Sequence, residues 1–289
     1  MLREHDLIIE PRSKCPLYGT LRHESSALRA ERLLVICHGF AATSRWGFIP
    51  ALSEALVDAT TATLALDFSR NGTRNCSGSI QDFQALRDNC YRIEEDDLAA
   101  TVKAFHGTRP VESSAPHSCR VYDRFPEIFI LGHSRGADSV LGFASRSSLV
   151  TGVITLNAKS TVRAITPIIA QRWRARGYWE EMDFKSGRQI PLGVEFLTEL
   201  ERGHDRIEQA TRRLQCPLLA IHGERDQHTP SLHSTYLAQW ASKGEVEIIQ
   251  NADHFLGGEG NESCRENVGL VALAIKKFMN RVSTELRGS

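Results

Sequence analysis

Short apolar segments alternate with longer segments of helical periodicity along most of this chain of 289 residues. Such alternation is typical of α/β proteins, in which helices cover both faces of a mostly parallel sheet. We expect the first two strands to form an antiparallel pair. The length is at the upper end for one domain, and one large α/β sheet can use all of it. The predicted strands are residues 6–10, 16–22, 32–40, 61–68, 128–133, 150–157, 216–223 and 245–251.

Helices are expected in most of the intervals between these strands. In residues 89–106, for example, the apolar residues Ile93, Leu98, Val102 and Phe105 recur at roughly helical spacing. The polar segments 69–79 and 107–125 have no such periodicity, and we expect loops there. The predicted helices are residues 46–57, 89–106, 134–147, 194–214, 230–241 and 264–280.

Residues 158–214 interrupt the alternation. An insertion of this size next to a sheet is typical of a cap or lid. We therefore predict a core of residues 1–157 and 215–289 with a cap of residues 158–214. Three aromatic residues of the cap either line a substrate pocket or fix the cap to the sheet, and the sequence leaves both open: Trp173, Tyr178 and Trp179. Three nearby arginines could contact an acidic substrate, but we favour a solvated helix face for them: Arg172, Arg174 and Arg176.

Charge and composition argue against several classes of protein. The chain has 35 Lys plus Arg and 35 Asp plus Glu, so its formal net charge is zero. Without a basic run or an aromatic–basic stripe, we expect no nucleic-acid binding. No segment has the apolar length of a signal peptide or a membrane span, and we expect a cytoplasmic protein with no membrane partner. The seven cysteines include no CxxC pair, which favours free thiols over disulfides or a zinc site.

The segment GHSRG, residues 132–136, follows a short apolar strand and opens a predicted helix. This is the context of a nucleophile elbow, in which glycines leave room for a tight turn and a serine occupies its apex. Ser134 is therefore a candidate nucleophile. A helix N-cap is the alternative role for it. A serine hydroxyl is neutral at pH 7, so catalysis also requires a base and a group that orients the base.

Two later loops supply these groups. Asp226 follows the predicted strand 216–223, and His254 follows the predicted strand 245–251. Each could be only a loop residue. However, both lie beyond the carboxyl ends of strands, where open α/β sheets place their sites. The order serine, aspartate, histidine is also the order expected for this elbow. Together the three residues predict a Ser–His–Asp triad.

A triad also needs donors for the negative charge that develops on the substrate oxygen. The segment HGF, residues 38–40, follows a buried strand, and we expect the backbone amides of Phe40 and Arg135 to form this oxyanion hole. The side chain of Arg135 could bind a substrate carboxylate. We favour the alternative, a surface arginine that points away from the pocket.

Three histidines lie close together in the sequence around Asp226: His222, His228 and His233. No carboxylate or cysteine completes a plausible ligand set with them, and we expect no metal and no cofactor.

The combination of HGF, DFSRNGTRNCSG, GHSRGA, HGERDQHTP and ADHF resembles the α/β-hydrolase superfamily over about residues 32–280. The resemblance is closer to dienelactone-hydrolase-like and cinnamoyl or feruloyl-esterase-like proteins, which are related to serine aminopeptidases. It implies an eight-stranded, mostly parallel sheet flanked by helices, with a helical lid after the sixth strand. It also implies Ser134, His254 and Asp226 as nucleophile, base and orienting acid, with the Phe40 and Arg135 amides as oxyanion hole.

The sequence departs from these relatives at two points. An arginine occupies a usually small position in the loop that begins at Asp67 and Phe68, and we expect it to narrow or charge the approach to the site. A dienelactone hydrolase proper has a cysteine nucleophile, so the serine at position 134 argues against that activity.

The sequence thus predicts a serine carboxylester hydrolase for small to medium acyl or aryl esters. A peptidase or thioesterase with the same triad is the alternative, because the lid and not the triad recognises the leaving group. A non-catalytic receptor on the same fold is less favoured, since all three triad residues are present. The expected partner is a small ester, and a homodimer is left open.

Overall fold

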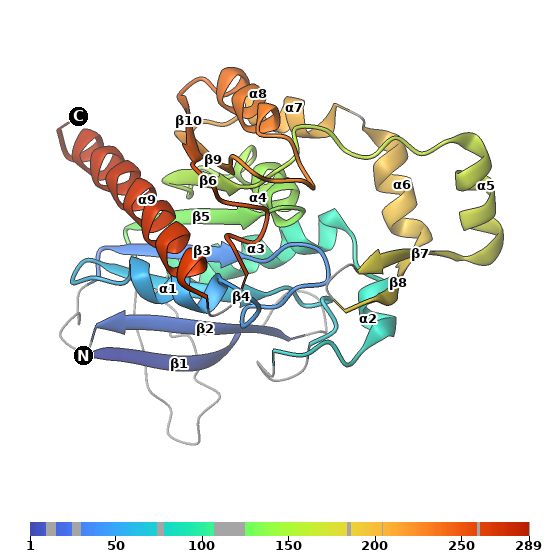
Figure 1. Cartoon of the computed structure of the whole chain (residues 1–289), viewed down its shortest axis with the longest axis horizontal. Coiled ribbons are helices and arrows are strands. Elements are labelled where there is room, and N and C mark those ends of the chain that lie inside the picture. Colours follow the sequence, from blue (N-terminus) through green and yellow to red (C-terminus); the bar gives the residue numbers. More distant parts are fainter. Residues whose placement is uncertain are drawn as a thin grey trace.

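The computed structural model describes residues 1–9, 16–24, 30–73, 78–106, 125–183, 186–203, 205–258 and 261–288. Within these ranges, an eight-stranded sheet forms the centre of the molecule and helices pack around it (Figure 1). The strands of this sheet are β1 (Leu2–Ile9), β2 (Leu17–Glu24), β3 (Arg32–Cys37), β4 (Thr61–Asp67), β5 (Glu127–His133), β6 (Gly152–Leu156), β9 (Leu218–Gly223) and β10 (Gly244–Ile249).

The strand order in the sheet is β1-β2-β4-β3-β5-β6-β9-β10. The β1–β2 and β2–β4 pairs are antiparallel. The other neighbouring pairs, from β4–β3 through to β9–β10, are parallel. The predicted α/β sheet and its antiparallel opening pair are therefore confirmed.

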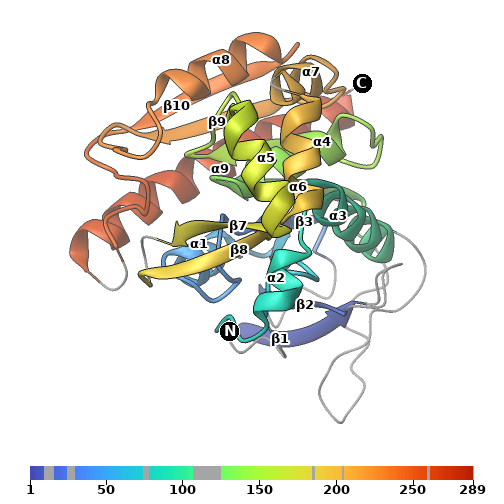
Figure 2. The same ribbon diagram turned by 90° about the vertical axis from the view of Figure 1, so that its right-hand side faces the viewer.

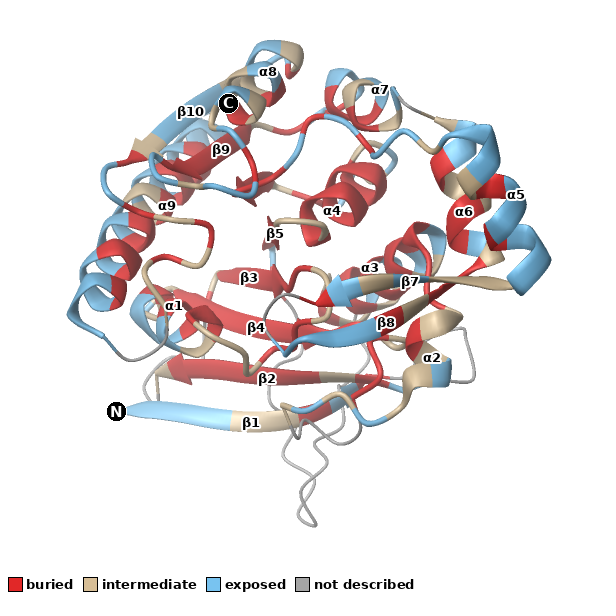
Figure 3. Cartoon of the chain, turned by 45° about the vertical axis from the view of Figure 1, so that its right-hand side comes forward, coloured by how far each residue is buried: buried red, intermediate tan, exposed pale blue. Residues whose placement is uncertain are grey.

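Helices on both faces of the sheet bury its central strands (Figure 3). Successive residues of β3 alternate between two apolar cores, with Leu33 and Val35 in one and Leu34 and Ile36 in the other. The second core also contains apolar residues of α1 and α9, and the first contains those of α3, α4, α7 and α8. These helices are α1 (Ile49–Leu56), α3 (Tyr91–His106), α4 (Gly136–Ala144), α7 (Arg206–Arg212), α8 (Leu232–Trp240) and α9 (Glu262–Gly288).

The predicted cap segment begins after β6 and contains α5 (Pro167–Arg176), β7 (Tyr178–Asp183), β8 (Arg188–Gly193), α6 (Val194–Arg202) and α7. Figure 2 shows α5, α6 and the antiparallel β7–β8 hairpin side by side. Trp173 of α5 is buried, and its indole N–H donates to the carbonyls of Leu192 and Gly193 at 2.9 and 3.1 Å. This contact ties α5 to the end of β8.

The structure corrects the prediction of a helical lid in two places. Tyr178–Asp183 and Arg188–Gly193 form the antiparallel β7–β8 pair, since Gly177 ends α5 at φ 80° and Gly187, just before β8, has φ 69°. The helix predicted over 194–214 ends at Arg202 and resumes at Arg206, with Gly203 as the C-cap of α6. A short helix, α2 (Phe83–Arg87), was also not predicted. Most of the predicted loop 107–125 lies outside the described residues.

Within the described ranges, no helix combines the length and the apolar composition that crossing a bilayer requires.

Candidate active site

Ser134 lies between β5 and α4 in a tight turn that has no room for a side chain at Gly132 or Gly136. Its φ is 51°, an uncommon value for a residue with a side chain, and its N–H donates to the carbonyl of Leu156 at 2.9 Å. A Cβ on Gly136 would lie 2.3 Å from the carbonyl oxygen of His38. A Cβ on Gly132 would lie 2.5 Å from the Cα of Ala137. The elbow predicted from GHSRG is therefore a sterically fixed strand–turn–helix junction with the serine at its apex.

The structure brings His254 and Asp226 together with Ser134. The Nε2 atom of His254 is 3.0 Å from the Ser134 Oγ, and its Nδ1 atom is 2.6 Å from the Asp226 Oδ2. With Nδ1 protonated toward the carboxylate, Nε2 is free to accept the serine proton. His254 is mostly buried, at 6 % relative exposure. Side chains from three different loops thus form one hydrogen-bonded chain.

The carboxylate of Asp226 is held ionised by several donors. Its Oδ1 accepts from the backbone N–H groups of His228 and Thr229, each at 2.8 Å. Its Oδ2 lies 3.3 Å from the Nε2 of the fully buried His222. Burial alone would raise the pKa of Asp226, but hydrogen bonds from His222 and His254 outweigh it and hold this pKa well below the usual range of an aspartate. The group therefore carries a negative charge at neutral pH.

Asn157, at the end of β6, connects the two loops that carry Asp226 and His254. Its Nδ2 donates to the backbone carbonyls of Asp253 and His254 at 3.2 and 3.0 Å. Its Oδ1 accepts from the N–H of Gly223 at 2.8 Å. Sequence reasoning did not identify this residue. The available signal was an asparagine that ends a buried strand, since asparagine tolerates the positive φ of 53° observed here.

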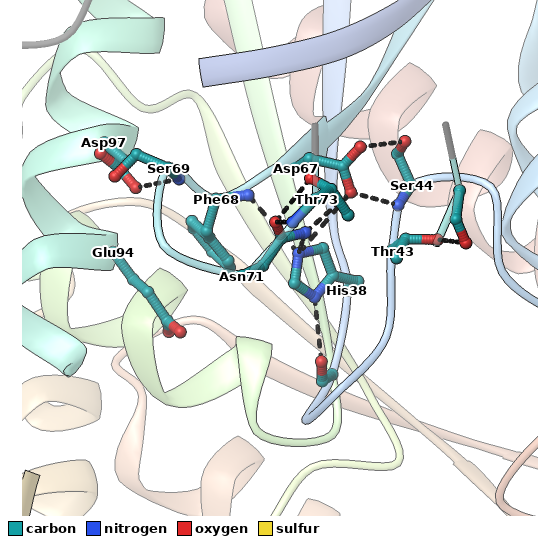
Figure 4. A network of polar contacts seen from close by, with 12 residues as sticks. His38, Thr43, Ser44, Asp67, Phe68, Ser69, Asn71, Thr73, Glu94 and Asp97 are labelled. Carbon is teal, nitrogen blue, oxygen red and sulfur yellow. Dashed lines mark hydrogen bonds and ion pairs between the residues drawn. The ribbon is translucent and has the colours of Figure 1, made fainter. Parts of the chain in front are cut away.

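The loop after β3 that carries Phe40 is anchored by a buried polar network (Figure 4). The Nδ1–H of His38 donates to the carbonyl of Gly39 at 2.9 Å, and its Nε2 accepts from Asn71 at 3.0 Å. Asp67, at the end of β4, accepts from the backbone N–H and the hydroxyl of Ser44, both at 2.7 Å, and from Asn71 at 2.9 Å. Burial lowers the pKa of His38, which favours the neutral ring that this network requires.

This loop also touches the elbow, because a Cβ on Gly39 would lie 3.1 Å from the Cβ of Ser134. The structure therefore places the segment with Phe40 against the predicted nucleophile, as an oxyanion hole requires. Arg135 is the residue that follows Ser134 in the elbow.

A cavity of about 210 Å³ opens at Ser134. It is smaller than the pockets that hold drug-sized ligands, so it suits a small substrate group. Apolar side chains that follow β6 in the sequence form much of its wall: Val162, Ile165, Trp173, Leu192, Phe196 and Leu200.

Of the three aromatic residues predicted at the substrate site, Trp173 lines this cavity and also fixes the cap. Tyr178 and Trp179 are not among the described residues of the lining. The ring of Tyr178 lies 4.3 Å from the guanidinium carbon of Arg176, and Trp179 stacks against Trp173 with ring centroids 6.1 Å apart. Trp179 therefore packs within the cap, while Tyr178 contacts Arg176 and also Arg87 of α2. The cap arginines 172, 174 and 176 are exposed, as expected.

The structure contradicts the interpretation of Arg135 as a surface arginine. Its side chain is only 17 % exposed and lines the cavity. The guanidinium forms an ion pair with Glu94 of α3, which is itself 2 % exposed. Next to it, the hydroxyl of Tyr91 donates to the Oδ2 of Asp138 at 2.9 Å, and both of these residues also line the cavity. One wall of the cavity is therefore polar and charged, and Lys159, Arg163 and Glu181 add further charged groups to the lining.

His228, His233 and Arg70 are not among the described residues that line the cavity. The Nδ1 of His233 accepts from the backbone N–H of Ser160 at 3.2 Å and lies 2.7 Å from its hydroxyl. The ring of His228 lies 5.0 Å from that of His254. In the described part of the chain, no group of three or more His, Cys, Asp or Glu side chains could hold a metal ion. Arg70, the arginine at the usually small position, lies 3.5 Å from the carboxylate of Asp88.

We expect Asp67→Ala to lower the free energy of unfolding by about 3 kcal/mol, since it leaves buried donors of Ser44 and Asn71 without an acceptor. Urea denaturation measures this change. Asp67→Asn is the matched control, because it keeps one acceptor oxygen and nearly the same volume. Equal stability of wild type and Asp67→Ala would contradict the anchoring role of the network.

Asp138 gives the folded protein a specific pH dependence. Burial raises the pKa of Asp138 to about 7, above the value of about 3.9 expected in the unfolded chain. Between these two pKa values the carboxyl is protonated in the folded state and ionised in the unfolded state. The protonated carboxyl therefore stabilises the folded state at low pH, and this stabilisation falls as the pH rises toward about 7 and is lost above it. We expect Asp138→Asn to lack this loss. Urea titrations of both proteins at several pH values between 5 and 8 test it, and parallel profiles would contradict it.

Comparison with known proteins identifies the fold. No family model matches the sequence. The structure is similar to that of Est1E from Butyrivibrio proteoclasticus with bound ferulic acid, at a TM-score of 0.67 and 20 % identity, covering 96 % of this chain and 99 % of that one. It is also similar to the esterase domain of a Rhodothermus marinus protein, at a TM-score of 0.60 and 21 % identity, covering 97 % and 98 % of the two chains.

A third similar structure is DcsB in complex with a substrate analogue, at a TM-score of 0.70 and 13 % identity, covering 96 % of this chain and 99 % of that one. In sequence, 78 residues are 32 % identical to an (R)-3-hydroxydecanoyl-ACP:CoA transacylase from Pseudomonas putida. That match spans 27 % of this chain and only 26 % of the transacylase. The sheet order, the elbow and these structural similarities together show that the chain has the α/β-hydrolase fold predicted from its sequence.

Proposed function

We propose that this chain is a serine hydrolase that cleaves carboxylic esters with small to medium acyl or aryl groups. The main support is the hydrogen-bonded chain from Ser134 through His254 to Asp226, with distances of 3.0 and 2.6 Å, next to a cavity that Ser134 itself lines. A serine needs a base within hydrogen-bond reach and an acid that orients the base, and this site has both. Similar structures named as esterases add support from the fold.

In the acylation step, His254 takes the hydroxyl proton of Ser134 at Nε2 while Oγ attacks the ester carbonyl carbon. The negative charge on the carbonyl oxygen is bound by the backbone amides of Phe40 and Arg135. His254 then gives the proton to the leaving alkoxide, which departs as an alcohol and leaves an acyl ester on Ser134. The ionised Asp226 fixes the His254 tautomer and stabilises the imidazolium.

In the deacylation step, His254 removes a proton from water as the water oxygen attacks the acyl ester. The second tetrahedral intermediate collapses, Ser134 recovers its proton from His254, and a carboxylic acid is released. Residues 158–214 act as the lid that shapes the acyl pocket, because Val162, Ile165 and Trp173 line it.

Acyl transfer from a thioester is the second candidate function. The partial sequence match to a transacylase favours it over peptide hydrolysis. Both reactions pass through the same acyl-serine and differ in the leaving group and in the acceptor that takes the acyl group.

We expect Ser134→Ala to lower kcat by at least about 10³-fold, because the variant loses the nucleophile. The assay is hydrolysis of 4-nitrophenyl esters from acetate to dodecanoate, together with methyl ferulate and a short acyl thioester. Ser148→Ala, at an exposed position, is the matched control and should retain wild-type rates. Turnover of thioesters but not of oxygen esters would favour the second function. If folded wild type cleaves none of them, or if Ser134→Ala stays active, the hydrolase proposal is wrong.

We expect Asn157→Ala to lower kcat about 10-fold or more with a smaller effect on KM, because the loops of His254 and Asp226 lose their shared hydrogen bonds. Steady-state kinetics on the best ester measures the split. Asn157→Asp is the informative comparison, since it keeps the acceptor for Gly223 but loses the donor to His254. An unchanged kcat in Asn157→Ala would show that these loops are held without Asn157.

A further inference from the structure

The polar wall of the cavity contains a mostly buried cation whose side chain the proposed reaction does not use. Arg135 contributes its backbone amide to the proposed oxyanion hole, but its side chain extends into the wall beside Ser134. Its guanidinium carbon lies 5.1 Å from the ring centroid of Phe196, 5.6 Å from that of Tyr91 and 5.7 Å from that of Phe40. Three aromatic rings therefore surround the guanidinium group and fix its position.

The hydrogen-bonding capacity of this guanidinium is only partly used. Its Nη2 donates to Glu94. Glu94 is itself held in place, because Asn89 donates to its Oε1 at 2.7 Å and Ser139 donates to its Oε2 at 2.5 Å. The Nε–H and Nη1–H groups of Arg135 have no hydrogen-bond partner in the described ranges of the chain. Neither nitrogen is among the buried atoms that lack a partner, so both keep some accessible surface. These donors therefore remain for a molecule in the cavity.

The charges around Arg135 determine which kind of acceptor, an anion or a neutral oxygen, can bind to these donors. Glu94 already neutralises the guanidinium, and Asp138 lies on the same wall across Tyr91. The other cations of the lining are Arg163, which pairs with Glu181, and the exposed Lys159. A substrate carboxylate on the donors of Arg135 would lie next to Glu94, which already balances the charge of Arg135, and would lose its own hydration. A neutral oxygen accepts the same hydrogen bonds without that cost.

We propose that Arg135 makes the enzyme selective for esters whose acyl group carries a neutral acceptor oxygen, such as a keto, ether or hydroxyl oxygen. This inference rests on the proposed hydrolase function and names the substrate class for it. The apolar wall formed by Val162, Ile165 and Trp173 takes the hydrocarbon part of the acyl group, and the donors of Arg135 take its oxygen.

The test compares acyl groups that differ by one oxygen. The substrates are 4-nitrophenyl pentanoate and hexanoate, and their 4-oxopentanoate and 5-oxohexanoate analogues. For at least one pair, we expect wild type to favour the oxo ester about tenfold in kcat/KM, the effect of one hydrogen bond to a charged donor. The monoanionic 4-nitrophenyl adipate should be a worse substrate than the hexanoate. A preference for plain alkyl esters in both pairs, or for the adipate, would overturn the inference.

The variant Arg135→Met with Glu94→Gln tests whether Arg135 is the source of this preference. Removing both charges avoids leaving Glu94 buried without a partner, and the variant should lose the oxo preference. Arg135→Lys keeps the charge but replaces the planar fork by one ammonium group, and it should show a reduced preference. It also tests the inference if the double variant does not fold. If either variant keeps the full wild-type preference for oxo esters, a residue other than Arg135 is responsible for that preference.

A binding experiment separates failure of this inference from failure of the proposed function. Methyl 5-oxohexanoate and methyl hexanoate are titrated into folded Ser134→Ala and followed by NMR. Tighter binding of the oxo ester supports the inference even where no ester is turned over. Serine-dependent turnover without discrimination, together with equal binding of the two esters, would overturn the inference and leave the hydrolase proposal intact.

Discussion

Three pieces of backbone meet at Ser134 so closely that no side chain fits between them. The carbonyl of His38 occupies the space where a Cβ on Gly136 would lie, and the start of α4 occupies the space beside Gly132. This contact sets the distance between the loop after β3 and the first turn of α4. Both proposed oxyanion donors belong to these two segments. Steric exclusion thus restricts the position of Ser134 relative to them.

The other half of the site is positioned by hydrogen bonds. Asn157 ties the loop with His254 to the end of β9, while Asp226 accepts from the backbone of its own loop. Loops are the most variable parts of an α/β protein, and their backbone groups need partners where they are buried. A single asparagine at the end of β6 provides such partners for two loops. It therefore links the end of β9, which precedes the Asp226 loop, to the loop that carries His254.

The sequence allowed the sheet to be predicted, and it allowed Ser134, Asp226 and His254 to be placed at the carboxyl ends of its strands. Buried strands and the loops that follow them leave strong local patterns. The strands β7 and β8 escaped prediction, since they are partly exposed and contain charged residues such as Glu180 and Arg188. The burial of Arg135 escaped prediction for a different reason. Its partners Glu94 and Phe196 are distant in sequence, and no local pattern connects them.

The buried Arg135–Glu94 pair is difficult to explain by stability alone. Replacing a buried ion pair with apolar residues of similar volume is often neutral or stabilising, because each charge loses its hydration. Here the pair is also supported by Asn89 and Ser139, so several polar groups are held in the interior around one guanidinium. A purely structural wall could be built from residues like Phe40 and Phe196, which already surround the site. The guanidinium adds directed hydrogen-bond donors beside Ser134, and these donors are the basis of the polar-substrate recognition that we propose for it.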